Sequence, residues 1–141
     1  MKRIVNLTIN LAIVAVIATG AAQPAGAAST CTKATLKGSY GALLTGSIPG
    51  VGPFVTVAVA NFDGVGGWSY TETGNVNGKV FSGQHFVGAY TVASDCSGST
   101  TDSGGNATAL VVVNGGREIM AIGTGGAVFS IVLKKITGTD D

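Results

Sequence analysis

The chain has 141 residues, of which 45% are hydrophobic and 11% are charged, and its formal net charge is +1. Such a length suits one globular domain and excludes two of ordinary size. Scattered Lys and Arg residues argue against a nucleic-acid partner, because phosphate binding depends on clustered cations. His85 is the only histidine and the acidic residues are spread singly, so we also expect no metal ion and no cofactor.

The first 27 residues have the layout of a secretory signal peptide. Lys2 and Arg3 give a basic start, and Leu11–Ala22 is an apolar core too short to span a bilayer comfortably. Ala25 and Ala27 supply the small residues that a signal peptidase reads. We therefore expect cleavage to leave a domain over residues 28–141. That domain should be secreted, to the periplasm or the extracellular space, with no transmembrane segment after cleavage.

Cys31 and Cys96 are the only two cysteines. Export places them where disulfides persist, so we predict one bridge between them, with two free thiols as the alternative. A lipid-anchored Cys31 is disfavoured, because the preceding Ala28–Thr30 lacks the Leu and the adjacent small residue of a lipid-attachment site. A bridge that closes so long a loop contributes on the order of 4 kcal/mol in the chain-entropy model.

From Lys37 onward, short runs rich in Val, Ile, Thr and aromatic residues alternate with glycine pairs or Asx-Gly. This pattern is typical of antiparallel strands joined by tight turns, and no stretch carries a helical period. The predicted strands are Gly38–Ile48, Phe54–Phe62, Trp68–Val76, Lys79–Gln84 continuing into His85–Val92, Ser99–Ser103, Thr108–Val113, Glu118–Ile122 and Ala127–Ile136. With no room for crossover helices, we predict an all-β domain with antiparallel pairing.

A single up-and-down β-barrel of about eight strands is favoured over a sandwich. Strands such as Phe54–Ala60 and Ala109–Val113 are apolar on both faces, and closing the sheet removes its exposed edges. An outward face that is also apolar indicates contact with another surface. That surface is either a covering segment or a second subunit, so a homo-oligomer stays open.

Several short segments of the domain are similar in sequence to a known group of proteins. They are Cys31, Thr35–Gly41, Phe62–Gly64, Gly88–Val92, Asp95–Gly98 and Gly115–Ile119. These segments resemble small secreted bacterial proteins of unknown function whose fold looks like the calycin or allene-oxide-cyclase type of barrel. The resemblance implies this fold, an export route and a cysteine pair in these positions. It implies no catalytic residue.

The best concentration of functional side chains is aromatic and acidic. Trp68, Tyr70 and Glu72 share one face of their strand, and Glu118 and Met120 share one face of theirs. If both faces point into the barrel, they line an apolar pocket with a Trp–Tyr wall and carboxylates at its mouth, which suits a small-molecule site. If the faces point outward, the aromatic residues belong to the surface or to an interface.

Catalysis by a serine or cysteine would need His85 as its base. No G-x-S-x-G turn leads into a helix, and the cysteines are expected to be oxidised. We expect His85 to share a strand face with Phe81, Val87 and Ala89, as a packed or edge residue rather than a general base. No catalytic residue is therefore assigned.

Three functions from different classes fit such a domain. The favoured one is a secreted protein that binds a small apolar or amphipathic ligand in its lumen, since barrels of about eight strands hold one such molecule. The second is a structural or cell-surface protein that assembles through its apolar outer face. The third is a lumen-based cyclase or isomerase in which one Glu or Tyr supplies the proton chemistry. An enzymatic role is less favoured, because no catalytic motif supports it.

Overall fold

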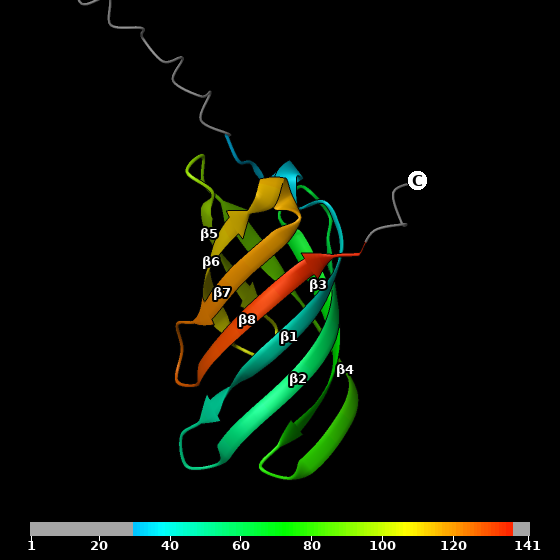
Figure 1. The fold of residues 1–141 in the computed structure, drawn as a ribbon, viewed down its shortest axis with the longest axis vertical. Coiled ribbons are helices and arrows are strands. Elements are labelled where there is room, and N and C mark those ends of the chain that lie inside the picture. Colours follow the sequence, from blue (N-terminus) through cyan, green and yellow to red (C-terminus); the bar gives the residue numbers. More distant parts are fainter. Residues whose placement is uncertain (1–29, 137–141) are drawn as a thin grey trace, which may run out of the picture.

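A computed structural model describes residues 30–136, which fold into one closed barrel of eight antiparallel strands (Figure 1). The strands are β1 (Gly38–Ile48), β2 (Gly52–Phe62), β3 (Gly67–Val76), β4 (Lys79–Val92), β5 (Ser97–Asp102), β6 (Ala107–Val113), β7 (Glu118–Gly123) and β8 (Val128–Lys135). Each strand pairs with the next along the chain, and β8 pairs with β1. The predicted up-and-down barrel is confirmed. The predicted signal peptide, residues 1–27, lies outside the described residues.

The strand limits agree closely with the predicted ones, because glycine and Asx residues in the turns end the pairing where the sequence indicated. The clearest differences are β2, which begins at Gly52 rather than Phe54, and β5, which covers Ser97–Asp102 rather than Ser99–Ser103. Within residues 30–136 the helical segments are two short 3-10 turns, η1 (Lys33–Leu36) and η2 (Asn114–Gly116). Neither is long and apolar enough to cross a membrane.

One end of the barrel is closed by η1, which lies across it at the top of Figure 1. Leu36 is fully buried there. The hydroxyl of Tyr90 on β4 donates to the carbonyl of Lys33 in η1, at 2.9 Å. On the other side, the hydroxyl of Tyr40 on β1 donates to the carbonyl of Gly116 in η2. These contacts close the end that carries the β2–β3, β4–β5 and β6–β7 turns.

The predicted disulfide between Cys31 and Cys96 is present, with 5.0 Å between the two Cα atoms. Cys31 precedes η1, and Cys96 lies in the β4–β5 turn at a positive φ of 69°. The backbone amide of Cys31 also donates to the carbonyl of Ser94 in the same turn. The bridge therefore fastens the segment leading into η1 to the closed end. A disulfide of this kind is typical of an oxidising, extracytoplasmic compartment.

A β-bulge in β4 decides which of its side chains face the lumen. Glu72 of β3 lies opposite Gln84, whereas Gly74 lies opposite Phe81, so β4 carries one extra residue between these pairs. Gly83 adopts a φ of +70° within the bulge, a conformation that favours glycine. The extra residue reverses the alternation, and both Phe81 and Gln84 line the lumen.

Because of the bulge, the strand face predicted for His85 is wrong. This residue does not share a face with Phe81: it is exposed on the outside of the barrel, and its Nδ1 lies 3.1 Å from Thr71 Oγ1 on β3. The sequence prediction assumed unbroken alternation along the strand, and a single inserted residue moves every side chain beyond it to the opposite face.

An apolar row runs around much of the outer surface. Directly paired, outward-facing residues form a continuous row across five strands, and each is at least partly exposed. This outer apolar belt consists of Val111, Met120, Val132, Leu43 and Val57. On β3 and β5 the exposed outward positions are threonine and serine instead, as at Thr71 and Ser99.

Candidate functional site

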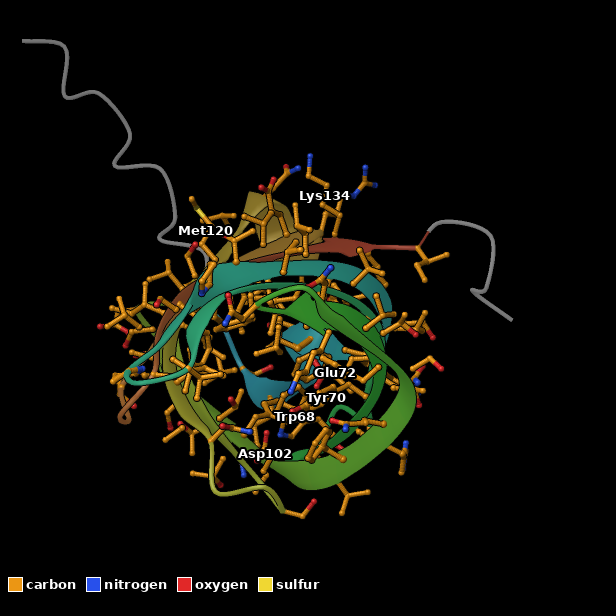
Figure 2. The ribbon with its side chains drawn as sticks, turned by 90° about the horizontal axis from the view of Figure 1, so that it is seen from below. Trp68, Tyr70, Glu72, Asp102, Met120 and Lys134 are labelled. Atoms are coloured by element: carbon orange, nitrogen blue, oxygen red, sulfur yellow. A yellow bond between two sulfur atoms is a disulfide. The ribbon has the colours of Figure 1, made fainter. Side chains whose placement is uncertain are left out.

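The lumen holds a cavity of about 360 Å³, to which all eight strands contribute side chains. Figure 2 looks into it from the end opposite η1, where the β1–β2 and β3–β4 hairpins lie. Most of the lining residues are aliphatic or aromatic. A cavity of this size and character lies at the lower end of the range found for small-molecule sites.

A stack of four aromatic rings forms the inner part of the wall. Phe62, Trp68, Tyr70 and Phe86 lie nearly parallel in succession, with ring centroids 5.6, 4.9 and 5.0 Å apart and interplanar angles of 18° to 23°. The rings come from β2, β3 and β4, three neighbouring strands. All four residues line the cavity and form a continuous aromatic part of its wall, which suits an apolar ligand.

The polar tips of the stack are bonded within the protein. Trp68 Nε1 donates to the carbonyl of Thr101 at 3.1 Å, and the Tyr70 hydroxyl donates to the Asp102 carboxylate at 2.7 Å. Burial raises the pKa of the Tyr70 phenol, and its hydrogen bond to Asp102 raises it further. Tyr70 therefore stays neutral at physiological pH.

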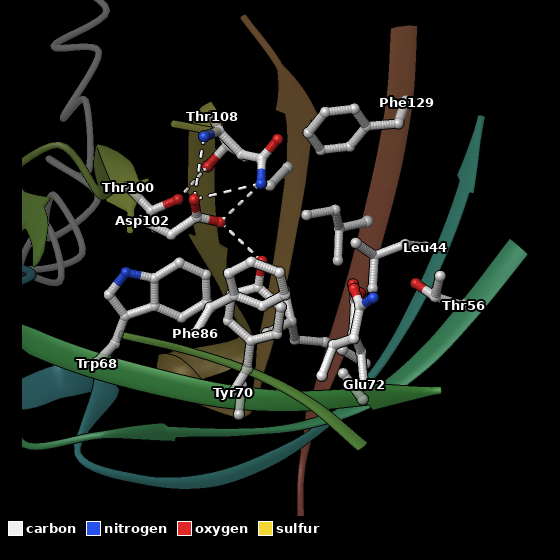
Figure 3. A pocket seen from close by; sticks show the side chains of 18 of the residues that line it. Leu44, Thr56, Trp68, Tyr70, Glu72, Phe86, Thr100, Asp102, Thr108 and Phe129 are labelled. Carbon is white, nitrogen blue, oxygen red and sulfur yellow. Dashed lines mark hydrogen bonds between the residues drawn. The ribbon is translucent and has the colours of Figure 1, made fainter. Parts of the chain in front are cut away.

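Asp102 organises the β5–β6 turn while its carboxylate lines the lumen (Figure 3). Besides the Tyr70 hydroxyl, it accepts hydrogen bonds from the Asn106 side chain and from the backbone amides of Gly104 and Asn106. A carboxylate with this many donors has little remaining capacity to accept further bonds. Its main local role is to hold the turn.

Three polar side chains line the wall between the aromatic stack and the open end. This polar band consists of Thr56 on β2, Glu72 on β3 and Gln84 on β4. Glu72 and Gln84 are register partners, and Thr56 is the partner of Gly74, two residues further along β3 from Glu72. Gly74 is required there, because a Cβ atom in its place would collide with the Thr56 methyl group. The three strands therefore bring the band to one side of the lumen.

The polar band contains an unsatisfied group. Thr56 is 3% exposed, and its Oγ1 has no hydrogen-bond partner within residues 30–136. Burial raises the pKa of Glu72, the nearby Thr56 hydroxyl lowers it, and the charge on Asp102 raises it. The Thr56 hydroxyl lies near the Glu72 carboxyl group without meeting the geometry of a hydrogen bond to it. Buried polar atoms usually have a partner, so this wall has capacity for one more polar group.

The structure brings three of the five candidate residues together at the cavity. Trp68, Tyr70 and Glu72 line it, whereas Glu118 and Met120 do not. Met120 is 53% exposed in the outer apolar belt, and Glu118 is the register partner of Lys134 on β8. The lumen face of β7 is formed by its alternate residues instead, which are Ile119 and Ala121.

The sequence left these faces ambiguous, because β7 is apolar on both. Period-two alternation then fixes which residues share a face and leaves open which face is inside. The residues that sequence reasoning missed are Thr56, Gln84 and Asp102. The sequence did indicate Thr56 as unusual. It alternates onto the same strand face as Ala58, and it is the one polar residue in the apolar run 54–60.

Comparisons with protein-family models, with curated proteins and with solved structures find no match to this chain. The described residues also contain no group of three or more His, Cys, Asp or Glu side chains placed to hold a metal ion. The features that bear on function lie in the lumen. Its distinguishing features are free volume, stacked aromatic rings and an incompletely satisfied polar band.

Proposed function

We propose that the protein is a secreted binding protein that holds one small apolar or amphipathic molecule in the barrel lumen. The observation that carries the proposal is the cavity of about 360 Å³ lined by an aromatic stack. A barrel of eight strands is just narrow enough to be filled by its own side chains, so free volume here is not an inevitable result of the fold. Apolar walls with a few placed polar groups are typical of ligand sites.

Two further observations support the proposal: the features that indicate secretion, and the resemblance to small secreted barrel proteins. The signal-like first 27 residues and the Cys31–Cys96 bridge favour secretion. The resemblance to small secreted bacterial barrels of the calycin or allene-oxide-cyclase type supports a barrel that works outside the cytoplasm. A closed end at η1 and hairpins at the other end give a ligand one natural route of entry.

The test uses Trp68, the only tryptophan of the chain, as the reporter. Titration of the exported protein with 1-decanol should change its emission saturably, because Trp68 lines the cavity. Ala121→Phe places a ring in the lumen and should abolish this change, with the circular dichroism spectrum preserved. Ala89→Phe places the same ring on the exposed outside of β4 and should leave it intact. No saturable change with the unmodified protein would contradict the proposal.

As a second candidate function, we propose self-assembly through the outer apolar belt. Exposed apolar residues that form a continuous surface commonly mark interfaces. The belt covers five neighbouring strands and so offers an extended apolar surface to a second copy of the chain. Sedimentation should show a mass that rises with protein concentration, and Met120→Lys should remove the rise, whereas Thr71→Lys on β3, outside the belt, should not. A monomer at every concentration would rule this function out.

A further inference from the structure

The charge of the lumen restricts the ligands that fit it. Both charged side chains on the cavity wall, Glu72 and Asp102, are carboxylates, and no Lys, Arg or His is found among the described residues that line it. A carboxylate ligand would lose its hydration on entry and find no cation to replace it. It would also face two groups of like charge in a medium that screens charge poorly. The wall therefore disfavours anions.

The hydrogen-bonding capacity of the lumen is concentrated in the polar band. Trp68 and Tyr70 use their polar atoms within the protein, and Asp102 is held by the β5–β6 turn. Thr100 and Thr108 bond to each other at 2.7 Å. Thr56 Oγ1, by contrast, is buried without a partner and lies beside the Glu72 carboxyl group. The polar band is therefore the part of the lumen wall that can bind a polar group of the ligand.

The band lies between two apolar regions. Along β3, Trp68 and Tyr70 lie on the closed side of Glu72, and along β2, Phe54 lies on the open side of Thr56. Phe54 packs edge-on against Phe129 of β8, with ring centroids 6.1 Å apart. A ligand whose polar group reaches the band can therefore bury its apolar part against rings on either side.

We propose that the lumen ligand is an apolar molecule whose polar group is a hydrogen-bond donor without negative charge, bound at Glu72 and Thr56. The shared chemistry is that of an alcohol or an alkylammonium, and carboxylates of the same chain length are discriminated against. This inference rests on the proposed lumen-binding function and specifies its ligand class. Glu72 accepts the donated hydrogen bond, and Thr56 gains the partner that it lacks in the protein alone.

The test compares three probes with the same ten-carbon chain: 1-decanol, decylamine and decanoate. At neutral pH they carry a neutral, a positive and a negative head group. Trp68 emission gives the apparent affinity for each, and calorimetry checks it. We expect decanol and decylamine to bind about tenfold or more tightly than decanoate. The difference between decanol and decylamine shows which of the two donors is preferred.

Two matched variants assign the discrimination to the lumen. Glu72→Gln removes a charge from the wall and should narrow the preference over decanoate at least several-fold, while decylamine binding weakens. Glu118→Gln makes the same change on the outside of β7 and should leave all three affinities unaltered, because Glu118 does not line the cavity.

The possible results distinguish a failure of the proposed ligand class from a failure of the proposed lumen-binding function. Equal binding of decanoate and decanol would overturn the ligand class and leave the lumen-binding function standing. Unchanged discrimination in Glu72→Gln, with binding retained, would overturn the role given to Glu72. Absence of binding by all three probes would contradict the lumen-binding function and this inference together.

Discussion

The indole ring of Trp68 occupies the space where a side chain at Gly88 would stand. The two residues are register partners on β3 and β4, and a Cβ atom on Gly88 would lie 2.7 Å from Trp68 Nε1. The same Cβ would collide with the carbonyl oxygen of Thr101, the acceptor of the indole hydrogen bond. The aromatic stack therefore depends on glycine at this position.

We predict that Gly88→Ala lowers the free energy of unfolding by about 2 to 4 kcal/mol, because the added methyl meets backbone that cannot move easily. Chemical denaturation measures the loss. Gly41→Ala is the matched control, since nothing lies within 4 Å of a Cβ at that strand glycine. It should change stability by no more than about 0.5 kcal/mol. Equal effects of the two substitutions would contradict the close packing.

Thr56→Val should make the ligand-free protein more stable by about 1 kcal/mol, because it removes a buried hydroxyl without a partner and keeps the methyl group that packs against Gly74. The same change should weaken decanol binding several-fold. Thr108→Val provides the comparison, since it breaks the 2.7 Å bond to Thr100 and should be destabilising by a similar amount. A loss of stability in Thr56→Val would show that the hydroxyl is already satisfied.

The tyrosines predict how stability changes at alkaline pH. Burial is the largest cause of a raised pKa at Tyr40, Tyr70 and Tyr90, and it raises the pKa of Tyr40 from 10.0 to about 12. Between these two values the unfolded chain has released protons that the folded protein retains. Their contribution to stability is thus complete below pH 10 and is lost as the pH rises toward 12. Tyrosinate absorbance should appear near pH 10 only in denaturant, and native titration at that pH would refute the burial.

Removal of the disulfide should lower the free energy of unfolding without removing the barrel. The bridge spans 65 residues of sequence, for which the chain-entropy model gives about 4 kcal/mol. We expect that loss in the double variant Cys31→Ser, Cys96→Ser, measured by denaturation. The unmodified protein under reducing conditions should lose the same amount. Unchanged stability in both cases would mean that η1 is held by its other contacts alone.

Much of the fold is predictable from the sequence because its signals are local. Glycine and Asx residues mark the turns, and eight strands with short connections leave closure as the way to remove sheet edges. The paired cysteines are similarly direct. Trp68, Tyr70 and Glu72 were grouped correctly because alternation on β3 is unbroken over these residues.

The remainder of the site depends on relationships that no local pattern encodes. The bulge at Gly83 moves the side chains that follow it to the opposite face of β4. The Ser-Gly sequence at this point does not distinguish a bulge from a regular strand. On β7, Met120 and Ile119 are both apolar, so only packing against the neighbouring strands selects which one is inside. The unsatisfied Thr56 hydroxyl becomes visible only when every surrounding atom is placed.

The pairing of β8 with β1 also determines how the molecule must form. Tyr40 lies opposite Lys135, so the pairing that closes the barrel joins the first and the last strand of the domain. Contacts of such long range are slow to form, because a large loop must close before they contribute. A chain that emerges N-terminus first would therefore hold β1 with one edge unpaired until β8 follows. Aggregation of the incomplete barrel, rather than unfolding of the finished one, is then the main hazard for this protein.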